Sequence, residues 1–353
     1  MWCLLAAVLT SLIAIPTAGT DALVKCLPLG TLVLFVVGLV TRRWRTGFQP
    51  RDLSPIAATL GFLLTASVTA GLMGLPFAIS DARSADSLDA TAGRIQGLFT
   101  NPNTLGLMGL LLCPVAVGLY IETKKRSNLL WALSGILAVL LSESRTSLAA
   151  LAIAAVVIAG LPVLRKGLFQ VQAWVLLVPV ALVLLFAYGR AILPESLARV
   201  FSRFSPDTSA RSRFNGREEL WSTAIQAWSE SPLVGHGYGQ SGIVMDRYRQ
   251  MGAFDIQSAS THQSFLQWGI ETGWLGFVGL AVAIFGVISG ALRKDHSPSA
   301  MGAAVAALAG VASMFMESVV FATGSAFPWV YWALAAAVVA GPRIRAEHSA
   351  ASS

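Results

Sequence analysis

Apolar stretches long enough to cross a membrane recur along almost the whole of this 353-residue chain. A hydrocarbon core needs about 20 apolar residues for each helical crossing. Hydrophobic residues make up 55% of the chain and charged residues 12%, a composition that excludes an ordinary soluble domain. We therefore predict an all-α, polytopic integral membrane protein with about ten transmembrane helices. They are expected near 2–20, 24–40, 54–79, 103–121, 128–142, 146–164, 171–189, 263–291, 300–321 and 326–341.

Basic residues orient these predicted helices, because short loops rich in lysine and arginine stay in the cytoplasm. Every second connection carries such a cluster: Arg42 to Arg51, Lys124 to Arg126, Arg165 and Lys166, Arg293 and Lys294, and Arg343 and Arg345. The alternation places both termini in the cytoplasm and accounts for the net charge of +7, so no nucleic-acid partner is expected. The connections expected to face outward are 80–102, 142–146, 190–261 and 317–326.

The connection over residues 190–261 is the one long polar excursion, between the seventh and eighth predicted helices. It divides the chain into N-terminal helices over 1–189, a large outward loop with short helices, C-terminal helices over 262–341 and a tail over 342–353. Its basic residues are all arginines, and the planar guanidinium group matches phosphate oxygens. We therefore expect an enzyme site at the membrane surface that acts on a phosphate-bearing substrate.

Arg217 is the first candidate phosphate ligand in this loop. Asn215 followed by Glu218 is typical of a helix start, which puts Arg217 in the first turn. Backbone N–H groups and the helix dipole favour an anion at that place. A diphosphate would fit there; in the alternative interpretation, Arg217 pairs with Glu218 or Glu219 on a solvated helix face.

Arg145 is a second candidate, in the tight connection between two predicted helices. An arginine so close to hydrocarbon is costly unless it snorkels to the interface, pairs or binds a ligand. Pairing with Glu143 and binding of a second phosphate are both open. Arg211 and Arg213 in the large loop are weaker candidates.

His262 stands where the large loop meets the next apolar stretch. Imidazole titrates near pH about 6.5, which suits a general base, although a polar anchor at the interface explains it equally. Gly269 and Gly273 form a pair that would let another helix approach closely. Glu271, inside the membrane, needs a polar partner, and we expect a structural hydrogen bond. His236, flanked by glycines in a tight turn, is a weaker candidate base.

Motifs of metal, ATP and nucleotide-sugar enzymes are missing from the sequence. It contains no HExxH, no Cys/His set with zinc spacing, no Walker lysine loop and no Asp-x-Asp pair. No metal and no cofactor are therefore expected.

Several short motifs follow one another between residues 94 and 280. They are Gly97 to Asn103, Ser144-Arg145-Thr146, Gly216-Arg217 with Leu220-Trp221, Pro232 to Gly239, and His262 with Leu266, Glu271, Gly273 and Gly276. In this order they resemble the O-antigen ligase and O-antigen polymerase family of bacterial envelope glycan enzymes. Asn103, in the first motif, is a weaker site candidate.

The resemblance implies metal-independent transfer of a glycan from undecaprenyl diphosphate to a glycan or lipid A core acceptor. It also implies a bacterial inner-membrane location with a periplasmic active site. The family's two essential arginines and one histidine correspond to Arg145, Arg217 and His262.

Other functions are open at this point. A polymerase uses the same donor with another acceptor, protein O-glycosylation is a third variant, and no residue identifies the acceptor or the oligomeric state. A transporter of a small anion is an alternative from another class. Its pathway would need polar residues near mid-membrane, where Glu271 is nearly alone.

Overall fold

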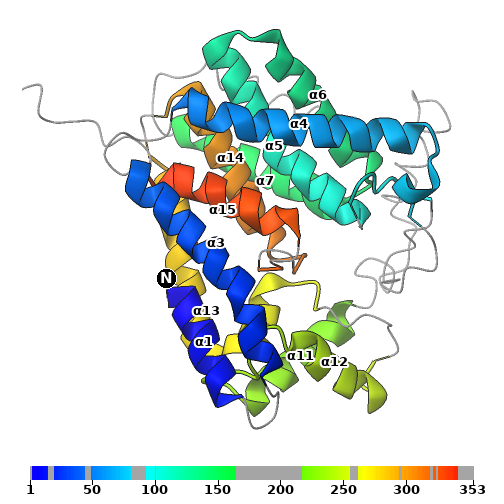
Figure 1. Cartoon of the computed structure of the whole chain (residues 1–353), viewed down its shortest axis with the longest axis vertical. Coiled ribbons are helices and arrows are strands. Elements are labelled where there is room, and N and C mark those ends of the chain that lie inside the picture. Colours follow the sequence, from blue (N-terminus) through cyan, green and yellow to red (C-terminus); the bar gives the residue numbers. More distant parts are fainter. Residues whose placement is uncertain are drawn as a thin grey trace, which may run out of the picture.

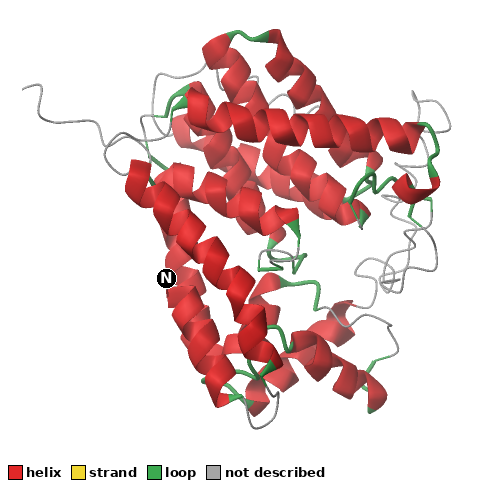
Figure 2. Ribbon diagram, viewed as in Figure 1, coloured by secondary structure: helices red, strands yellow, loops and turns green. Residues whose placement is uncertain are grey.

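The computed structural model is helical throughout the part of the chain that it describes (Figure 2). It describes residues 2–14, 20–43, 49–80, 93–99, 101–163, 217–254, 261–293, 296–318, 321–322 and 325–340. Within these ranges the only extended pairing is one antiparallel bridge between Ile79 and Ile95. The all-α prediction is therefore confirmed for the described residues.

Eleven α-helices and one 3₁₀ helix lie within these ranges. They are α1 (Trp2–Ile13), α3 (Asp21–Arg43), α4 (Pro50–Leu72), η1 (Pro76–Ala78), α5 (Pro102–Thr123), α6 (Arg126–Leu141), α7 (Arg145–Val163), α11 (Arg217–Glu230), α12 (Ser241–Gln250), α13 (Ser264–Ala291), α14 (Pro298–Ser313) and α15 (Ala326–Val339).

Nine of the ten predicted spans contain one of these helices, and the tenth, 171–189, lies outside the described residues. Four helices are long and apolar enough to cross a membrane: Leu23–Arg42, Asp52–Leu72, Pro102–Thr123 and Ser264–Ala291. Helices α6, α14 and α15 are apolar but have only 16, 16 and 14 residues. At 1.5 Å per residue each rises about 21–24 Å, less than the roughly 30 Å of a hydrocarbon core. Ten crossings remain a prediction.

Helix α5 is the centre of the larger group of helices. It is buried along most of its length, and α4, α6, α7, α14 and α15 pack around it (Figure 1). Helix α14 approaches most closely because it is rich in alanine and glycine. A methyl group added at Gly302 would overlap the carbonyl group of Pro114, and one added at Gly118 would overlap that of Pro298. Small residues at these positions are what allow the two backbones to meet.

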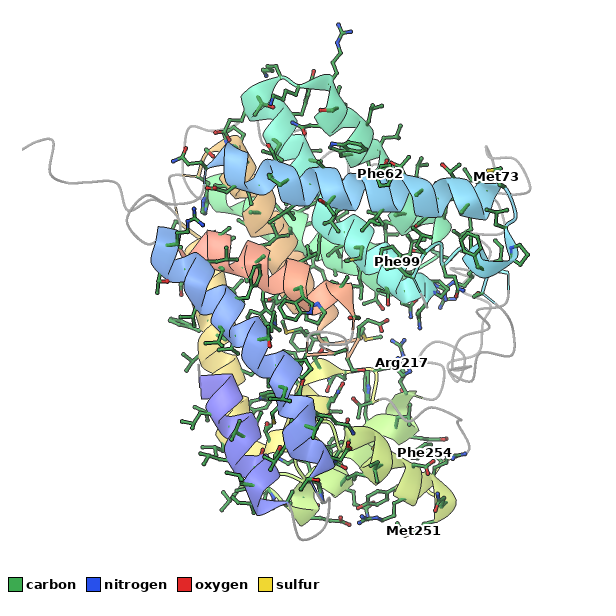
Figure 3. The ribbon with its side chains drawn as sticks, in the orientation of Figure 1. Phe62, Met73, Phe99, Arg217, Met251 and Phe254 are labelled. Carbon is green, nitrogen blue, oxygen red and sulfur yellow. The ribbon has the colours of Figure 1, made fainter. Side chains whose placement is uncertain are left out.

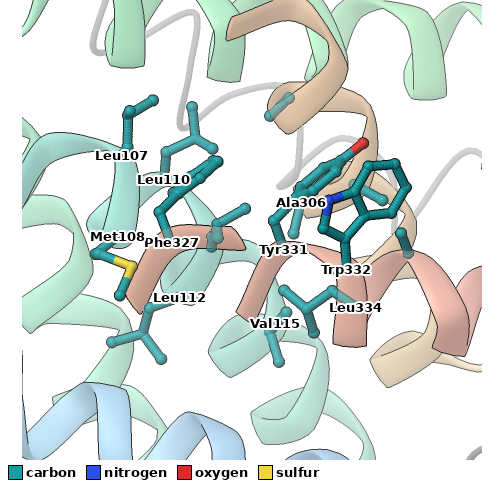
Figure 4. Close-up of a cluster of buried hydrophobic side chains, with 14 of the residues drawn as sticks. Leu107, Met108, Leu110, Leu112, Val115, Ala306, Phe327, Tyr331, Trp332 and Leu334 are labelled. Atoms are coloured by element: carbon teal, nitrogen blue, oxygen red, sulfur yellow. The ribbon is translucent and has the colours of Figure 1, made fainter. Parts of the chain in front are cut away.

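Larger side chains fill the space between α5 and α15. Leu107, Met108 and Leu110 of α5 face Phe327 and Tyr331 of α15, whose ring centroids are 5.9 Å apart (Figure 4). This cluster fixes α15 against the central helix. Since α15 also contacts α3 and α13, it links the central group to the second group of helices.

The second group is built on α13, a helix of 28 residues that contacts α1, α14 and α15. The short helices α11 and α12 pack against its first half (Figure 1). Leu220 and Ala224 of α11, Val244 and Met245 of α12, and Ile270 of α13 form a separate small core. The predicted short helices of the large loop are therefore present over residues 217–250.

A buried phenol strengthens the pairing of α11 with α12. Tyr248 donates a hydrogen bond to the carboxylate of Glu230. Burial and this hydrogen bond raise the pKa of Tyr248 to about 12, so the phenol keeps its proton at any ordinary pH.

Connections that the charge pattern assigns to the cytoplasm meet at one end of the molecule. Glu122, at the end of α5, accepts hydrogen bonds from Ser297 Oγ and from the backbone N–H of Ser299, each 3.0 Å long. Arg293 donates to the carbonyl of Val339 over 3.1 Å. The end of α5, the loop before α14 and the end of α15 are thus held together.

Close packing of α14 on α5 leads to a first prediction. Gly302→Ala should lower the melting temperature in detergent, because its methyl group has no room and overpacking costs about 1–3 kcal/mol. Gly286→Ala on α13 is the matched control, since the nearest atom to its added methyl group lies 4.0 Å away. Equal melting temperatures for the two variants would contradict the described contact.

Candidate active site

Glu317, directly after α14, is the point at which several distant segments meet. Its side chain is 5% exposed. Oε1 accepts hydrogen bonds from Asn103 Nδ2 at 3.2 Å and from Thr146 Oγ1 at 3.4 Å. Its backbone carbonyl accepts a hydrogen bond of 2.6 Å from Ser264 Oγ at the start of α13. The carboxylate is therefore bonded to the beginnings of α5 and α7, and the backbone of Glu317 to the beginning of α13.

Arg217 brings a positive charge to this carboxylate from the start of α11. Its side chain is 7% exposed, and its NH2 lies 3.9 Å from Glu317 Oε1. Figure 3 shows the side chain leaving α11 in the direction of the central helices. Burial of Leu220 and Ala224 against α13 sets the orientation of α11, and Trp221 Nε1 donates to the carbonyl of Thr261 over 3.1 Å. The helix is thus held with its first turn at the site.

His262 approaches the other oxygen of the same carboxylate. Its Nδ1 lies 3.9 Å from Glu317 Oε2, and its side chain is 11% exposed. The backbone φ of His262 is +48°, a left-handed conformation that non-glycine residues seldom adopt and that concentrates at functional sites. Gln263 then caps α13 by accepting a hydrogen bond from the N–H of Leu266 at 3.2 Å. The strained position aims the imidazole at Glu317 just before the helix begins.

Arg94 and Asn103 extend the cluster toward α5 and α6. Arg94 is 4% exposed, and its Nε donates to the carbonyl of Ser142 over 2.9 Å. Its NH2 donates to Asn103 Oδ1 over 2.9 Å, and the Asn103 amide in turn donates to Glu317. Asn103 therefore bridges the buried guanidinium of Arg94 and the carboxylate of Glu317 through hydrogen bonds.

Two arginines and one carboxylate leave this cluster with a surplus of positive charge even when His262 is neutral. Burial strengthens every electrostatic interaction in it, since the effective dielectric constant is lower than in water. Arg94, Thr146, Arg217 and Glu317 come from connections predicted to face outward, and Asn103 and His262 directly follow two of these connections. Chemically, the site offers anion binding beside an imidazole that can accept a proton.

A break in α13 holds the loop after α11 beside the site. Gly273 has φ +60° and interrupts the helix. The backbone N–H groups of Trp274 and Leu275 bond instead to the carbonyls of Pro232 and Leu233, at 2.8 and 3.2 Å. Non-helical backbone at membrane depth is tolerated where protein satisfies its polar groups, and here the loop does so.

The glycine pair in α13 faces another helix and the loop after it. A methyl group added at Gly269 would lie 2.7 Å from the indole ring of Trp228 in α11, and one added at Gly273 would overlap the backbone of Leu233. The pair therefore accommodates α11 and the loop that follows it. Small size at these positions is used, as predicted, for backbone approach.

Glu271 and His236 both make structural contacts near this break. Glu271 is 1% exposed, and its Oε1 accepts hydrogen bonds from Ser241 Oγ at 2.6 Å and Gln267 Nε2 at 3.1 Å. These bonds agree with the structural role expected for it. The Nε2 atom of His236 lies 2.9 Å from the carbonyl of Ala227, so this ring fastens the loop to α11.

Other predicted site residues are placed as follows. Arg145 is the first residue of α7 and is exposed, directly before Thr146, whose hydroxyl reaches Glu317. Arg211 and Arg213 lie outside the described residues. The structure thus brings Arg217, His262 and Asn103 together and puts Arg145 at the edge of the same cluster.

Glu317 and Arg94 were not singled out in the sequence, although both lie in connections predicted to face outward. Glu317 is an acidic residue at the end of an apolar run, and Arg94 precedes the Gly97 to Asn103 motif. A charged residue at a membrane boundary is a signal that could have identified both. Among the described residues, no group of three or more His, Cys, Asp or Glu side chains could hold a metal ion.

Comparison with known proteins supplies one match. Residues 129–281 match the family model described as O-Antigen ligase. The matched segment includes Arg145, Arg217 and His262. A search of curated proteins found no match.

Glu317 provides the second prediction. Glu317→Ala removes the negative charge that faces buried Arg217 and the hydrogen bonds that fix Asn103. Removal of one partner from a buried pair costs about 3–5 kcal/mol, so the melting temperature should fall strongly. Glu218→Ala, at an exposed position of α11, should leave it nearly unchanged, and equal effects of the two substitutions would contradict the central place of Glu317.

Proposed function

We propose that this chain, whose residues 129–281 match the O-antigen ligase family model, transfers a glycan from a polyprenyl diphosphate to an acceptor hydroxyl. The carrier is undecaprenyl diphosphate, the site faces the periplasm, and the membrane is the bacterial inner membrane. The observation that carries the proposal is the approach of Arg217 and His262 to opposite oxygens of Glu317, each at 3.9 Å.

The donor's diphosphate binds on the arginine side of the site. Arg217, buried at the start of a 14-residue helix, adds its charge to the backbone N–H groups of the first turn. Arg94 contributes a second buried charge behind Asn103, and Arg145 contributes a third at the edge. Preorganised cations at a developing negative charge stabilise the transition state without reorganisation.

The acceptor binds on the histidine side. His262 takes the proton from the attacking hydroxyl as its oxygen forms a bond to the anomeric carbon. The bond from that carbon to the phosphate oxygen breaks at the same time, and the diphosphate leaves with the electron pair. Glu317 acts as a positioning residue, because its carboxylate orients the imidazole and stabilises the imidazolium that forms. The separation of 3.9 Å in the absence of substrate is consistent with a contact that tightens on binding.

Ligase and polymerase share this chemistry and differ in the acceptor. Purified protein in liposomes, supplied with lipid-diphosphate glycan, separates them. A product that requires lipid A core selects the ligase, and chain extension without it selects the polymerase. Solute flux without any glycosidic product would overturn the proposal in favour of a transporter.

Loss of the proposed base is the third prediction. His262→Ala should lower glycan transfer at least about 100-fold, in the range typical of general-base catalysis. His296→Ala is the matched control, because that histidine lies before α14 at the opposite end of the molecule, with Nε2 3.2 Å from the carbonyl of Gly290. Transfer by the His262 variant at the rate of the control would contradict the assigned role.

Guanidinium geometry at position 217 gives the fourth prediction. Arg217→Lys keeps the charge but loses the two-pronged contact to phosphate, so turnover should fall on the order of 100-fold, or about 3 kcal/mol. The rate of product formation at saturating donor measures this. Arg249→Lys on α12 is the control, since Arg249 pairs locally with Asp246; near wild-type turnover by Arg217→Lys would exclude bidentate binding at this position.

A further inference from the structure

A cavity of about 430 Å³ lies beside the site and takes no part in the chemistry described above. It lies between the start of α3, the loop after α11, the first half of α13 and residues Phe321, Ala322 and Ser325. Its lining residues are Lys25, Pro28, Tyr238, Gly239, Gln267, Glu271, Phe321, Ala322 and Ser325. Each of these residues belongs to the described part of the chain.

Cavity and site share two walls. The first wall is α13, where Gln267 and Glu271 follow His262 along the helix. The second carries Glu317 at the site and Phe321 at the cavity. Ser264 joins the two walls, because its Oγ donates to the Glu317 carbonyl at 2.6 Å and its N–H donates to the Met314 carbonyl at 2.9 Å.

The polar groups of the cavity are a carboxylate, a carboxamide and an ammonium group. The carboxylate of Glu271 is buried and bonded to the amide of Gln267 over 3.1 Å. Lys25 Nζ donates to the Gly239 carbonyl over 3.1 Å and remains partly exposed. A carboxylate, a carboxamide and an amine together can accept from and donate to a ring of hydroxyl groups.

Aromatic rings also line the cavity. Phe321 stacks on Trp268 with ring centroids 4.0 Å apart and planes inclined by 23°. Tyr238 meets Trp268 edge-on at 5.9 Å, and its hydroxyl donates to the Phe321 carbonyl over 2.8 Å. These rings are fixed by one another and present an apolar wall of defined shape.

We propose that this cavity binds a sugar ring of the acceptor glycan. A pyranose combines an apolar face with a rim of hydroxyls, which matches an aromatic wall together with these polar groups, and the volume lies in the range of small-molecule pockets. The proposal rests on the proposed function, because it assigns the ligand to the acceptor of that reaction.

Different groups face the two carboxylate oxygens of Glu317, and this difference assigns the cavity to the acceptor rather than to the donor. Arg217, Asn103 and Thr146 approach Oε1, whereas His262 approaches Oε2. In a direct displacement the attacking oxygen enters opposite to the leaving diphosphate, so the acceptor belongs on the side of the base. The cavity follows His262 along α13 and therefore lies on that side.

Filling the cavity tests the proposal directly. Ala322→Trp should raise the KM for the acceptor at least about tenfold, equivalent to the loss of about 1.4 kcal/mol of binding, with the KM for lipid-diphosphate glycan unchanged. Ala253→Trp, the same change at an exposed position after α12, should alter neither. A rise in the donor KM alone would assign the cavity to the donor and overturn the proposal, as would unchanged values for both substrates.

A second variant removes a contact without filling space. Gln267→Ala should also raise the acceptor KM several-fold through loss of a hydrogen bond of about 1 kcal/mol. Gln226→Ala, at an exposed site on α11, is its control. An acceptor KM equal to that of the control would count against a hydrogen bond from Gln267 to the sugar.

Direct binding distinguishes failure of this proposal from failure of the proposed function. Saturation-transfer NMR with methyl β-glucoside and methyl β-galactoside on the purified protein needs no donor and no turnover. Signals that vanish in Ala322→Trp but persist in Ala253→Trp support the cavity as a sugar site even if no transfer activity is found. Signals of equal strength in both variants, or none with wild type, would overturn it.

Discussion

A buried carboxylate beside a buried arginine is the constraint on which the rest of this structure depends. Glu317 is almost inaccessible to solvent, and an uncompensated charge in such a place would be prohibitively costly. Compensation comes from Arg217, from the amide of Asn103 and from the hydroxyl of Thr146. Because these residues begin α11, α5 and α7, the helices can satisfy Glu317 only in one mutual arrangement.

The break in α13 at Gly273 is the second feature that fixes the site around Glu317. An unbroken helix would carry its first half away from α11, whereas Gly273 turns the backbone and releases two N–H groups to the loop at Pro232 and Leu233. The N–H groups of His236 and Gly237 in turn reach the carbonyls of Ile270 and Glu271, at 2.8 and 3.0 Å. These hydrogen bonds join the loop after α11 to α13, and they hold both Arg217 and His262 against the central group of helices.

Local patterns in the sequence predicted the elements better than their contacts. Apolar runs located nine described helices, and the Asn-x-x-Glu signature placed Arg217 in the first turn of a helix, where it lies. Helices α14 and α15 end earlier than the predicted 321 and 341, at Ser313 and Val339, since apolar residues continue into the turns that follow them. The small face formed by Gly269 and Gly273 was predicted, but the helical stripe did not identify α11 and the loop after it as the segments that cover this face.

The residues that meet at the site could likewise be predicted only in part from the sequence. Arg217 and His262 were predicted through residue types and through the resemblance, whereas Glu317 lies 55 residues beyond His262 and 100 beyond Arg217, with nothing local to link them. Arg94 likewise contacts the carbonyl of Ser142, which lies 48 residues further along the chain. Such contacts follow from how α5, α7, α13 and α14 pack, and that packing depends on small residues such as Gly302 meeting the Pro114 backbone.

Photocrosslinking with a polyprenyl diphosphate that carries a reactive group next to its phosphates is the most direct test of the site. Mass spectrometry of the purified protein in liposomes would locate the adducts. Labelling of the segments around Arg94, Arg145 and Arg217, suppressed by an excess of unmodified polyprenyl diphosphate, is the expected result. Labelling confined to the opposite end, at the basic residues around Arg126 and Arg293, would contradict a diphosphate site at Glu317.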